Sequence, residues 1–224
     1  MVAPNPLHPL PNPLPNTMAV PTALSPTNTY PSLPFDPAWP AQGQWTYDDF
    51  LRLPDDGVRY EIIDGVLYMS NAPDVAHQHA VHQIAVEFEI FARAGDRGIV
   101  LTAPIEVHLP DIAQPVQPDV LFVSQTRREI IKEKFIDGAP DLIVEVSSPS
   151  TARLDRKVKL DAYERAGVRE YWIANPRTRF VEVYVLTRGE YVLRGEYGPG
   201  DRISSDALPG LELVTDKVFV AAQP

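Results

Sequence analysis

The chain of 224 residues contains no cysteine. This absence excludes disulfide bonds, cysteine-ligated zinc or iron–sulfur sites, and catalysis by a thiol. No stretch approaches the roughly 18 consecutive apolar residues that a membrane-spanning helix requires, so we expect a soluble, cytoplasmic protein with no membrane partner. The phosphate-binding patterns G-x-x-x-x-G-K-S/T and G-x-G-x-x-G are missing as well, which leaves a nucleotide cofactor without support.

Charge is nearly missing from the first 44 residues, where Asp36 is the only charged side chain. Twelve of the 24 prolines lie in residues 1–40. Because proline lacks a backbone N–H and restricts the residue before it, this segment cannot form a helix or an internal strand. We therefore expect residues 1–44 to be a proline-rich, disordered tail and residues 45–224 to form one folded domain. A domain of that size can bury about 70% of its unfolded surface without a disulfide or a structural metal.

The apolar pattern of the second part predicts a mixed β-sheet with a few helices. Thr46 is a typical helix N-cap, and Asp64-Gly65 between two apolar runs predicts a hairpin. Such a mixture indicates an α/β (α+β) domain in which helices flank a mixed central sheet. We expect helices over 74–94 and 150–166, and strands over 60–63, 66–69, 99–109, 116–123, 141–147, 170–174, 180–186 and 189–195.

Two acidic residues interrupt strongly apolar strands. Glu145 stands in Leu142-Ile143-Val144-Glu145-Val146, and Asp119 begins the run Asp119–Val123. An unpaired carboxylate inside such a strand costs several kcal/mol, roughly. If the two strands are neighbours, both carboxylates can converge on a cation, and oxygen ligands suit Mg²⁺ or Mn²⁺. The alternative is that each acid pairs separately with an arginine or lysine, or that Asp119 lies at an exposed strand end.

The helix that follows Glu145 adds further polar residues. Asp155, Lys159 and Tyr163 are spaced i, i+4 and i+8, so they share one helix face. If this face packs back on the sheet, Lys159 can reach Glu145 and stabilise an attacking hydroxide or a phosphate oxygen. An exposed Asp155–Lys159 ion pair, worth a few tenths of a kcal/mol, is the alternative.

Two further groups allow two interpretations each. His77, His79 and His82 suggest zinc, but only His79 and His82 share a helix face and no His-Glu-x-x-His pattern is present, which favours ordinary helix residues. Basic clusters lie on either side of the two acidic strands, and they are either solvated faces or a rim that follows a phosphate backbone. They comprise Arg127, Arg128, Lys132 and Lys134 on one side and Arg153, Arg156 and Lys157 on the other.

Several spaced motifs resemble the Uma-type family of restriction endonucleases, which is part of the PD-(D/E)XK nuclease superfamily. The resemblance spans roughly residues 45–220 and depends on the order of the motifs. They are Tyr60-Glu61-x-x-Asp64-Gly65, His77, Pro118-Asp119-Val120, Asp141–Val146 with Ser148-Pro149-Ser150, and Asp155-x-x-x-Lys159-x-x-x-Tyr163-x-x-x-Gly167-Val168-x-Glu170-Tyr171-Trp172.

The resemblance implies a role for each matching residue. Asp119 corresponds to the acid of the PD element and Glu145 to the acid of the (D/E)XK element, with Glu61 as a further metal ligand. The superfamily lysine is expected two residues after Glu145, where this chain has Ser147. Lys159 on the next helix is expected to replace it. Tyr163, Asp155, His77 and Ser147 are expected to support the site.

Together these observations predict a Mg²⁺- or Mn²⁺-dependent endonuclease that hydrolyses DNA phosphodiester bonds through Asp119 and Glu145 with help from Lys159. We expect a homodimer, because duplex cleavage usually needs two sites. The net charge of −10 argues against nonspecific coating of nucleic acid. Two alternatives stay open: a nuclease-fold binding or regulatory protein with a decayed site, and a phosphodiesterase with a small substrate.

Overall fold

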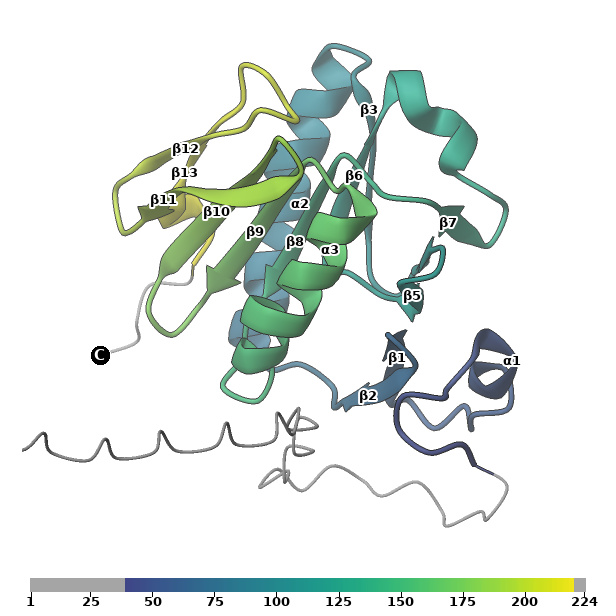
Figure 1. The fold of residues 1–224 in the computed structure, drawn as a ribbon. Helices are drawn as coiled ribbons and strands as arrows, with labels where there is room; N and C mark the ends of the chain where they lie inside the picture. Colours follow the sequence, from purple (N-terminus) through teal and green to yellow (C-terminus); the bar gives the residue numbers. More distant parts are fainter. Residues whose placement is uncertain (1–38, 220–224) are drawn as a thin grey trace, which may run out of the picture.

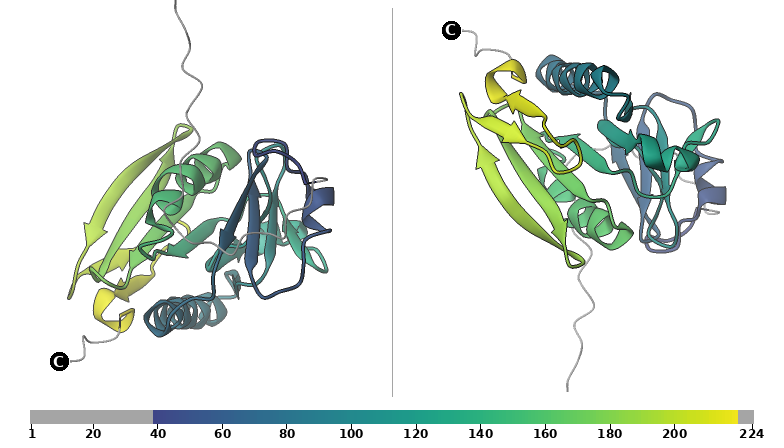
Figure 2. Two further views of the ribbon diagram at one scale, coloured as in Figure 1. Left: turned by 90° about the horizontal axis from the view of Figure 1, so that it is seen from below. Right: turned by 90° about the horizontal axis from the view of Figure 1, so that it is seen from above.

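The computed structural model describes residues 39–219, so residues 1–38 of the predicted proline-rich tail lie outside the described range. Two mixed β-sheets stand side by side, and helices α2 (Val75–Ala94) and α3 (Leu160–Ala166) lie on opposite faces of the larger sheet (Figures 1 and 2). The order of the larger sheet is β11 (Glu190–Tyr197), β10 (Phe180–Thr187), β9 (Glu170–Asn175), β8 (Leu142–Val146), β6 (Val120–Ser124), β3 (Gly98–Thr102). The order of the smaller sheet is β2 (Val66–Ser70), β1 (Arg59–Ile63), β5 (Ala113–Val116), β4 (Glu106–Leu109), β7 (Phe135–Asp137).

Shorter elements complete the fold. None of the helices between residues 39 and 219 is long and apolar enough to cross a membrane. The remaining elements are α1 (Tyr47–Phe50), the 3₁₀ helices η1 (Gln125–Ile130) and η3 (Thr215–Lys217), the π-helix η2 (Leu154–Lys159), and a small pair of strands, β12 (Arg202–Ser204) and β13 (Glu212–Val214).

Local sequence explains where several elements begin and turn. The Thr46 side chain accepts a hydrogen bond from the backbone of Asp49, whose own side chain returns a contact to Thr46, so α1 starts with a capping box. Asp64 and Gly65 have φ values of 50° and 69°, the positive values that a tight two-residue hairpin turn requires. The predicted hairpin between β1 and β2 is therefore present.

The core has two layers, one on each face of the larger sheet. On one face, Ile84 and Phe88 of α2 are fully buried, and the Phe88 ring meets Trp172 edge to face at 5.2 Å. The other face packs against α3 and the smaller sheet. Successive residues of β8 alternate between these layers: Leu142, Val144 and Val146 belong to the α2 side and Ile143 to the other. The mixed fold with flanking helices is the one the sequence predicts.

Three predicted elements differ from the structure. The strand expected over 99–109 is two strands, β3 and β4, in different sheets, because Pro104 has no N–H to donate inside a strand. The strand expected over 116–123 is likewise divided by Pro118 between β5 and β6. The helix after Ser150 contains a π-helical stretch before α3, and periodicity at 3.6 residues per turn cannot reveal the wider turn.

Candidate active site

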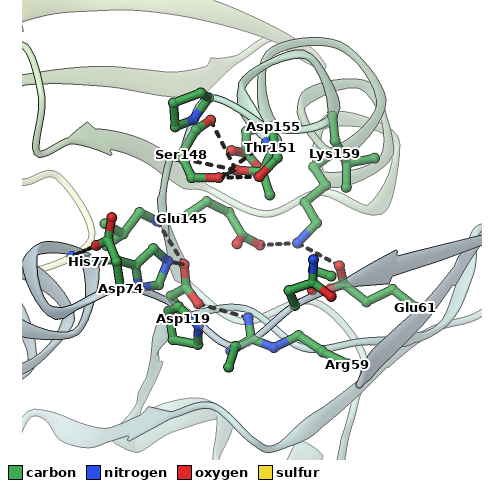
Figure 3. Close-up of a pocket in the computed structure, with 18 residues that line it drawn as sticks. Arg59, Glu61, Asp74, His77, Asp119, Glu145, Ser148, Thr151, Asp155 and Lys159 are labelled. Atoms are coloured by element: carbon green, nitrogen blue, oxygen red, sulfur yellow. Dashed lines mark hydrogen bonds and ion pairs between the residues drawn. The ribbon is translucent and has the colours of Figure 1, made fainter. Parts of the chain in front are cut away.

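The predicted acids lie around one cavity, of about 410 Å³, where the ends of β6 and β8 meet β1 and η2 (Figure 3). β6 and β8 are antiparallel neighbours, with Val120 opposite Val144, so Asp119 lies beside Glu145. The expectation that these two strands are adjacent is confirmed. The lining residues are Arg59, Glu61, Ser70, Asn71, Ala72, Pro73, Asp74, His77, Asp119, Glu145, Val146, Ser148, Pro149, Ser150, Thr151, Leu154, Asp155 and Lys159.

Asp119 is buried and is held by three donors. Its Oδ1 lies 2.8 Å from Arg59 Nη1, and its Oδ2 accepts from the Val146 backbone N–H at 2.8 Å. His77 Nε2 lies 3.2 Å from the same Oδ2. Burial alone would raise the pKa of Asp119, but His77 and Arg59 outweigh it and hold this pKa at about 2. Asp119 is therefore an ionised carboxylate at neutral pH.

Glu145 is equally buried but has the opposite electrostatic character. Its Oε1 accepts hydrogen bonds from Lys159 Nζ at 2.9 Å and from the Tyr163 hydroxyl at 2.8 Å. Burial raises the pKa of Glu145 to about 8, although Lys159 lowers it, and the nearby Asp119 and Glu61 carboxylates raise it further. Within residues 39–219, no side chain or backbone group donates to Oε2. This oxygen is available for a ligand in the cavity.

Lys159 lies between two carboxylates. Its Nζ is 2.9 Å from Glu145 Oε1 and 2.9 Å from Glu61 Oε2, and its side chain is 3% exposed. Burial would lower the pKa of Lys159, but the charges of Glu145 and Glu61 raise it above its ordinary value, so the ammonium stays charged. Glu61 is itself held in place from β1, because its Oε1 accepts from the Gln117 backbone N–H at 2.8 Å.

Asp155 lies one helical turn before Lys159 on η2 and is almost completely buried. Burial raises the pKa of Asp155. Its Oδ2, the Ser147 hydroxyl and His77 Nδ1 are buried polar atoms that have no hydrogen-bond partner in the described part of the chain. The expected alternative, an exposed Asp155–Lys159 ion pair, is not present: both side chains are buried, and Lys159 contacts Glu145 and Glu61 instead.

The structure thus gathers six of the eight predicted site residues at the cavity wall: Glu61, His77, Asp119, Glu145, Asp155 and Lys159. Tyr163 contacts the site through Glu145. Ser147 is buried next to Glu145 but is not part of the wall.

Other candidates lie elsewhere. His79 and His82 do not line the cavity. Arg127 contacts Asp141, which precedes β8, whereas Glu145 stands near the far end of that strand. The basic cluster over residues 127–134 therefore does not form a rim at the cavity. Arg156, in the second cluster, is paired with Glu182.

Arg59 is the contact that the sequence analysis missed. It occupies the first position of β1 and contacts Asp119 directly. The signal was available in the strand pattern, since residues i and i+2 of a strand share a face. Arg59 therefore had to lie on the same side as Glu61.

The ion pairs correspond to the alternative in which each acid meets a cation of the protein: Arg59 contacts Asp119 and Lys159 contacts Glu145. Among residues 39–219, no three histidine or acidic side chains already form a metal-binding group. Nevertheless the donor set suits Mg²⁺, which binds proteins through one or two carboxylates and keeps several waters. Asp119 and the open Oε2 of Glu145 provide those carboxylates beside a cavity with room for water.

Comparison with known proteins agrees with this geometry. A crystal structure described as "a putative nuclease belonging to DUF820" from Anabaena variabilis superposes with a TM-score of 0.65 at 18% identity, covering 78% of this chain and 97% of that chain. It shares the fold. No curated protein matches the sequence. The sequence profile of the family Uma2, described as "Putative restriction endonuclease", matches residues 47–216. Since the match covers well over half of its length, the chain belongs to the Uma2 family.

Proposed function

We propose that this protein is a metal-dependent endonuclease that hydrolyses DNA phosphodiester bonds, with Asp119 and Glu145 as ligands of Mg²⁺ or Mn²⁺. The observation that carries the proposal is the convergence of two buried carboxylates from adjacent strands, with a buried, charged Lys159 2.9 Å from one of them. Membership of a family described as restriction endonucleases supports the same reaction class.

The residues of the site suit this chemistry. A bound divalent ion lowers the pKa of its water and neutralises charge on the phosphate. Lys159 keeps a positive charge at the cavity wall beside Glu145, and a fixed positive charge near the substrate favours the anionic transition state of hydrolysis. Glu61 fixes the lysine from the opposite side, and Tyr163 fixes the Glu145 carboxyl. Because these contacts are buried, the side chains of Lys159 and Glu145 are held in fixed positions.

The direct test is a plasmid assay with Mg²⁺ or Mn²⁺. Wild-type protein should convert supercoiled DNA to nicked or linear forms, and EDTA should stop the reaction. Glu145→Gln and Asp119→Asn should lower the rate by at least about 100-fold, since loss of a group that only orients a metal ligand already costs about 10- to 100-fold. Glu212→Gln, which changes a 68% exposed acid on β13 away from the cavity, is the matched control and should cleave normally. Equal cleavage by wild type and Glu145→Gln would contradict the proposal.

A decayed nuclease is the second candidate, and the two protein ion pairs favour it. If Arg59 and Lys159 permanently take the place of the metal ion, the ion pairs stabilise the fold and the site has no catalytic activity. Isothermal titration of Mn²⁺ separates the two. The nuclease should bind Mn²⁺ in a manner that Asp119→Asn abolishes, whereas a decayed site should bind none.

A phosphodiesterase with a small substrate is the third candidate, because the net charge of −10 opposes a long anionic polymer. A chromogenic phosphodiester distinguishes it from an endonuclease. The endonuclease should cleave plasmid at protein concentrations at which the small diester is untouched. The opposite preference would favour the small-substrate enzyme.

We also propose that two copies assemble for duplex cleavage. β3 ends the larger sheet, and within residues 39–219 its outer edge has no neighbouring strand. The strand is uncharged, and uncharged edges without proline pair readily with another strand. Beside it, an apolar groove of about 420 Å³ is lined by Ala85, Val86 and Ile90, and Ile90 is 63% exposed. Antiparallel pairing of the β3 strands of two copies would cover both the open strand edge and this apolar groove.

Light scattering after gel filtration tests the dimer. Wild type should elute with twice the mass of the chain, and Ile90→Glu should be monomeric. Val192→Glu, at an exposed position on the opposite edge strand β11, is the matched control. A monomeric wild type at micromolar concentration would contradict this part of the proposal.

A further inference from the structure

Arg59 is the more exposed of the two cationic side chains that line the cavity. Its Nη1 donates to Asp119 Oδ1 at 2.8 Å and to the Gln117 carbonyl at 3.3 Å. Its side chain is 23% exposed, whereas Lys159 is 3% exposed and contacts two carboxylates. Of the 18 described residues that line the cavity, only these two carry a permanent positive charge. Arg59 is therefore the one that a ligand in the cavity can reach.

The partners of Asp119 differ in how easily they can leave. The Val146 N–H belongs to the backbone of β8, and His77 is fixed by the helix α2. Both contact Oδ2, whereas Arg59 is the one residue of the described range 39–219 that contacts Oδ1. An arginine has a long, flexible stem, and this one is partly exposed to solvent. A divalent cation that binds Asp119 through Oδ1 would stand next to the guanidinium, and the repulsion between the two charges disfavours their coexistence.

The released guanidinium has a second use. Arginine binds phosphate oxygens through two parallel hydrogen bonds, a geometry that lysine cannot provide. Arg59 lies on the same strand as Glu61 and lines the same cavity. A phosphodiester in this cavity would therefore meet the guanidinium once Arg59 no longer contacts Asp119.

We propose that Arg59 exchanges partners during loading of the site: it holds Asp119 in the metal-free protein, gives up Oδ1 to the divalent cation, and then binds the phosphodiester of the substrate. The inference depends on the proposed metal-dependent nuclease function. It makes Arg59 a competitor of the metal and a ligand of the substrate. Removal of its charge should therefore change metal affinity and DNA affinity in opposite directions.

Titration calorimetry with Mn²⁺ measures the first effect without any cleavage. Arg59→Met and Arg59→Gln should bind Mn²⁺ about tenfold more tightly than wild type, a change worth ~1.4 kcal/mol, because the competing charge is gone. Arg59→Gln keeps an N–H that can donate to Asp119, so it provides the same test if Arg59→Met does not fold. Arg59→Lys keeps the charge and should stay close to wild type.

Fluorescence anisotropy with a short DNA duplex and Ca²⁺, in place of Mn²⁺ to limit cleavage, measures the second effect. With Ca²⁺, Arg59→Met should bind DNA about tenfold more weakly than wild type. Without a divalent ion, the same variant should bind DNA nearly as wild type does, since Arg59 is then held by Asp119. Arg93→Met is the matched control, because this arginine on α2 is 77% exposed and does not line the cavity. It should change DNA affinity equally with and without Ca²⁺.

The outcomes separate the inference from the function it depends on. If wild type binds Mn²⁺ but both Arg59→Met and Arg59→Gln bind it equally or more weakly, the exchange is wrong and the metal site stands. A DNA-affinity loss that is the same with and without Ca²⁺ also contradicts the exchange. If wild type binds no divalent ion at all, the proposed nuclease function itself fails.

Discussion

Glu145 should make the metal-free protein less stable as the pH rises. Its pKa in the folded state is about 8, raised by burial, against an ordinary value of 4.5. A group whose pKa is raised by folding stabilises the fold fully below its unfolded pKa, and this contribution is lost as the pH rises through the folded pKa. A difference of about 3.5 units corresponds to roughly 5 kcal/mol. Between pH 4.5 and pH 8, the free energy of unfolding should therefore fall by about this amount through Glu145 alone.

The substitution Glu145→Gln isolates this contribution. The glutamine oxygen can still accept from Lys159 and Tyr163, and Lys159 keeps its contact with Glu61. Because glutamine does not titrate, the variant should lack the pH-dependent loss. At pH 5 the two proteins should have similar stability. At pH 9 Glu145→Gln should be more stable by on the order of 5 kcal/mol.

Urea unfolding in EDTA, followed by tryptophan fluorescence at pH values from 5 to 9, measures the difference. Titrating groups far from the cavity are common to both proteins, so their effects cancel in the comparison. Glu212→Gln, at an exposed position on β13, should remain parallel to wild type over the whole range. A difference between wild type and Glu145→Gln that does not change with pH would refute the electrostatic description of the site.

Three further changes test other parts of the structure. The pKa of Asp119 is about 2, below its ordinary value of 3.8, because His77 and Arg59 outweigh burial. Ionised Asp119 should therefore stabilise the fold by about 2 kcal/mol above pH 4, and this contribution is lost as the pH falls through 2. Urea denaturation should accordingly show that the loss of stability caused by Asp119→Asn becomes smaller between pH 5 and pH 3. Glu170→Ala removes the acceptor of four hydrogen bonds, from Trp172, Ser205 and the backbones of residues 206 and 207, and should cost about 3 kcal/mol and expose the β12–β13 hairpin to proteases. Gly65→Ala would place a Cβ 2.6 Å from the Gly43 carbonyl oxygen at a φ of 69°, so thermal unfolding should show a loss of about 2 kcal/mol or more.

The sequence was sufficient to predict elements whose signals are local. The β1–β2 hairpin depends on Asp64-Gly65 and α2 on its apolar spacing, and both are present. Asp119 and Glu145 could be recognised because a charge inside an apolar strand requires a partner. Where prolines interrupt an apolar run, as at Pro104, the sequence did not reveal that the halves join different sheets. That choice depends on contacts between residues distant in the chain.

The partners of the two acids could not be predicted in the same way. Arg59 is 60 residues from Asp119, and only the assembly of the smaller sheet against the larger one brings them together. Lys159 was expected near Glu145, because its helix directly follows that strand and because the family resemblance agrees, but its contact with Glu61 also depends on that assembly. The π-helical turn that carries Asp155 and Lys159 has no signal in the periodicity.

The charges of the cavity explain why a divalent ion suits it. Four buried carboxyl groups, those of Glu61, Asp119, Glu145 and Asp155, face the permanent cations Arg59 and Lys159. With all four ionised, two negative charges remain uncompensated among these buried groups, apart from the exposed Asp74 at the cavity wall. The raised pKa values of Glu145 and Asp155 show that burial and mutual repulsion oppose this state. One divalent cation supplies the two missing charges, so its binding should favour ionised Glu145 and release protons. Titration of Mg²⁺ in weakly buffered solution at pH 7 should therefore acidify the medium, whereas a site that holds no metal should leave the pH unchanged.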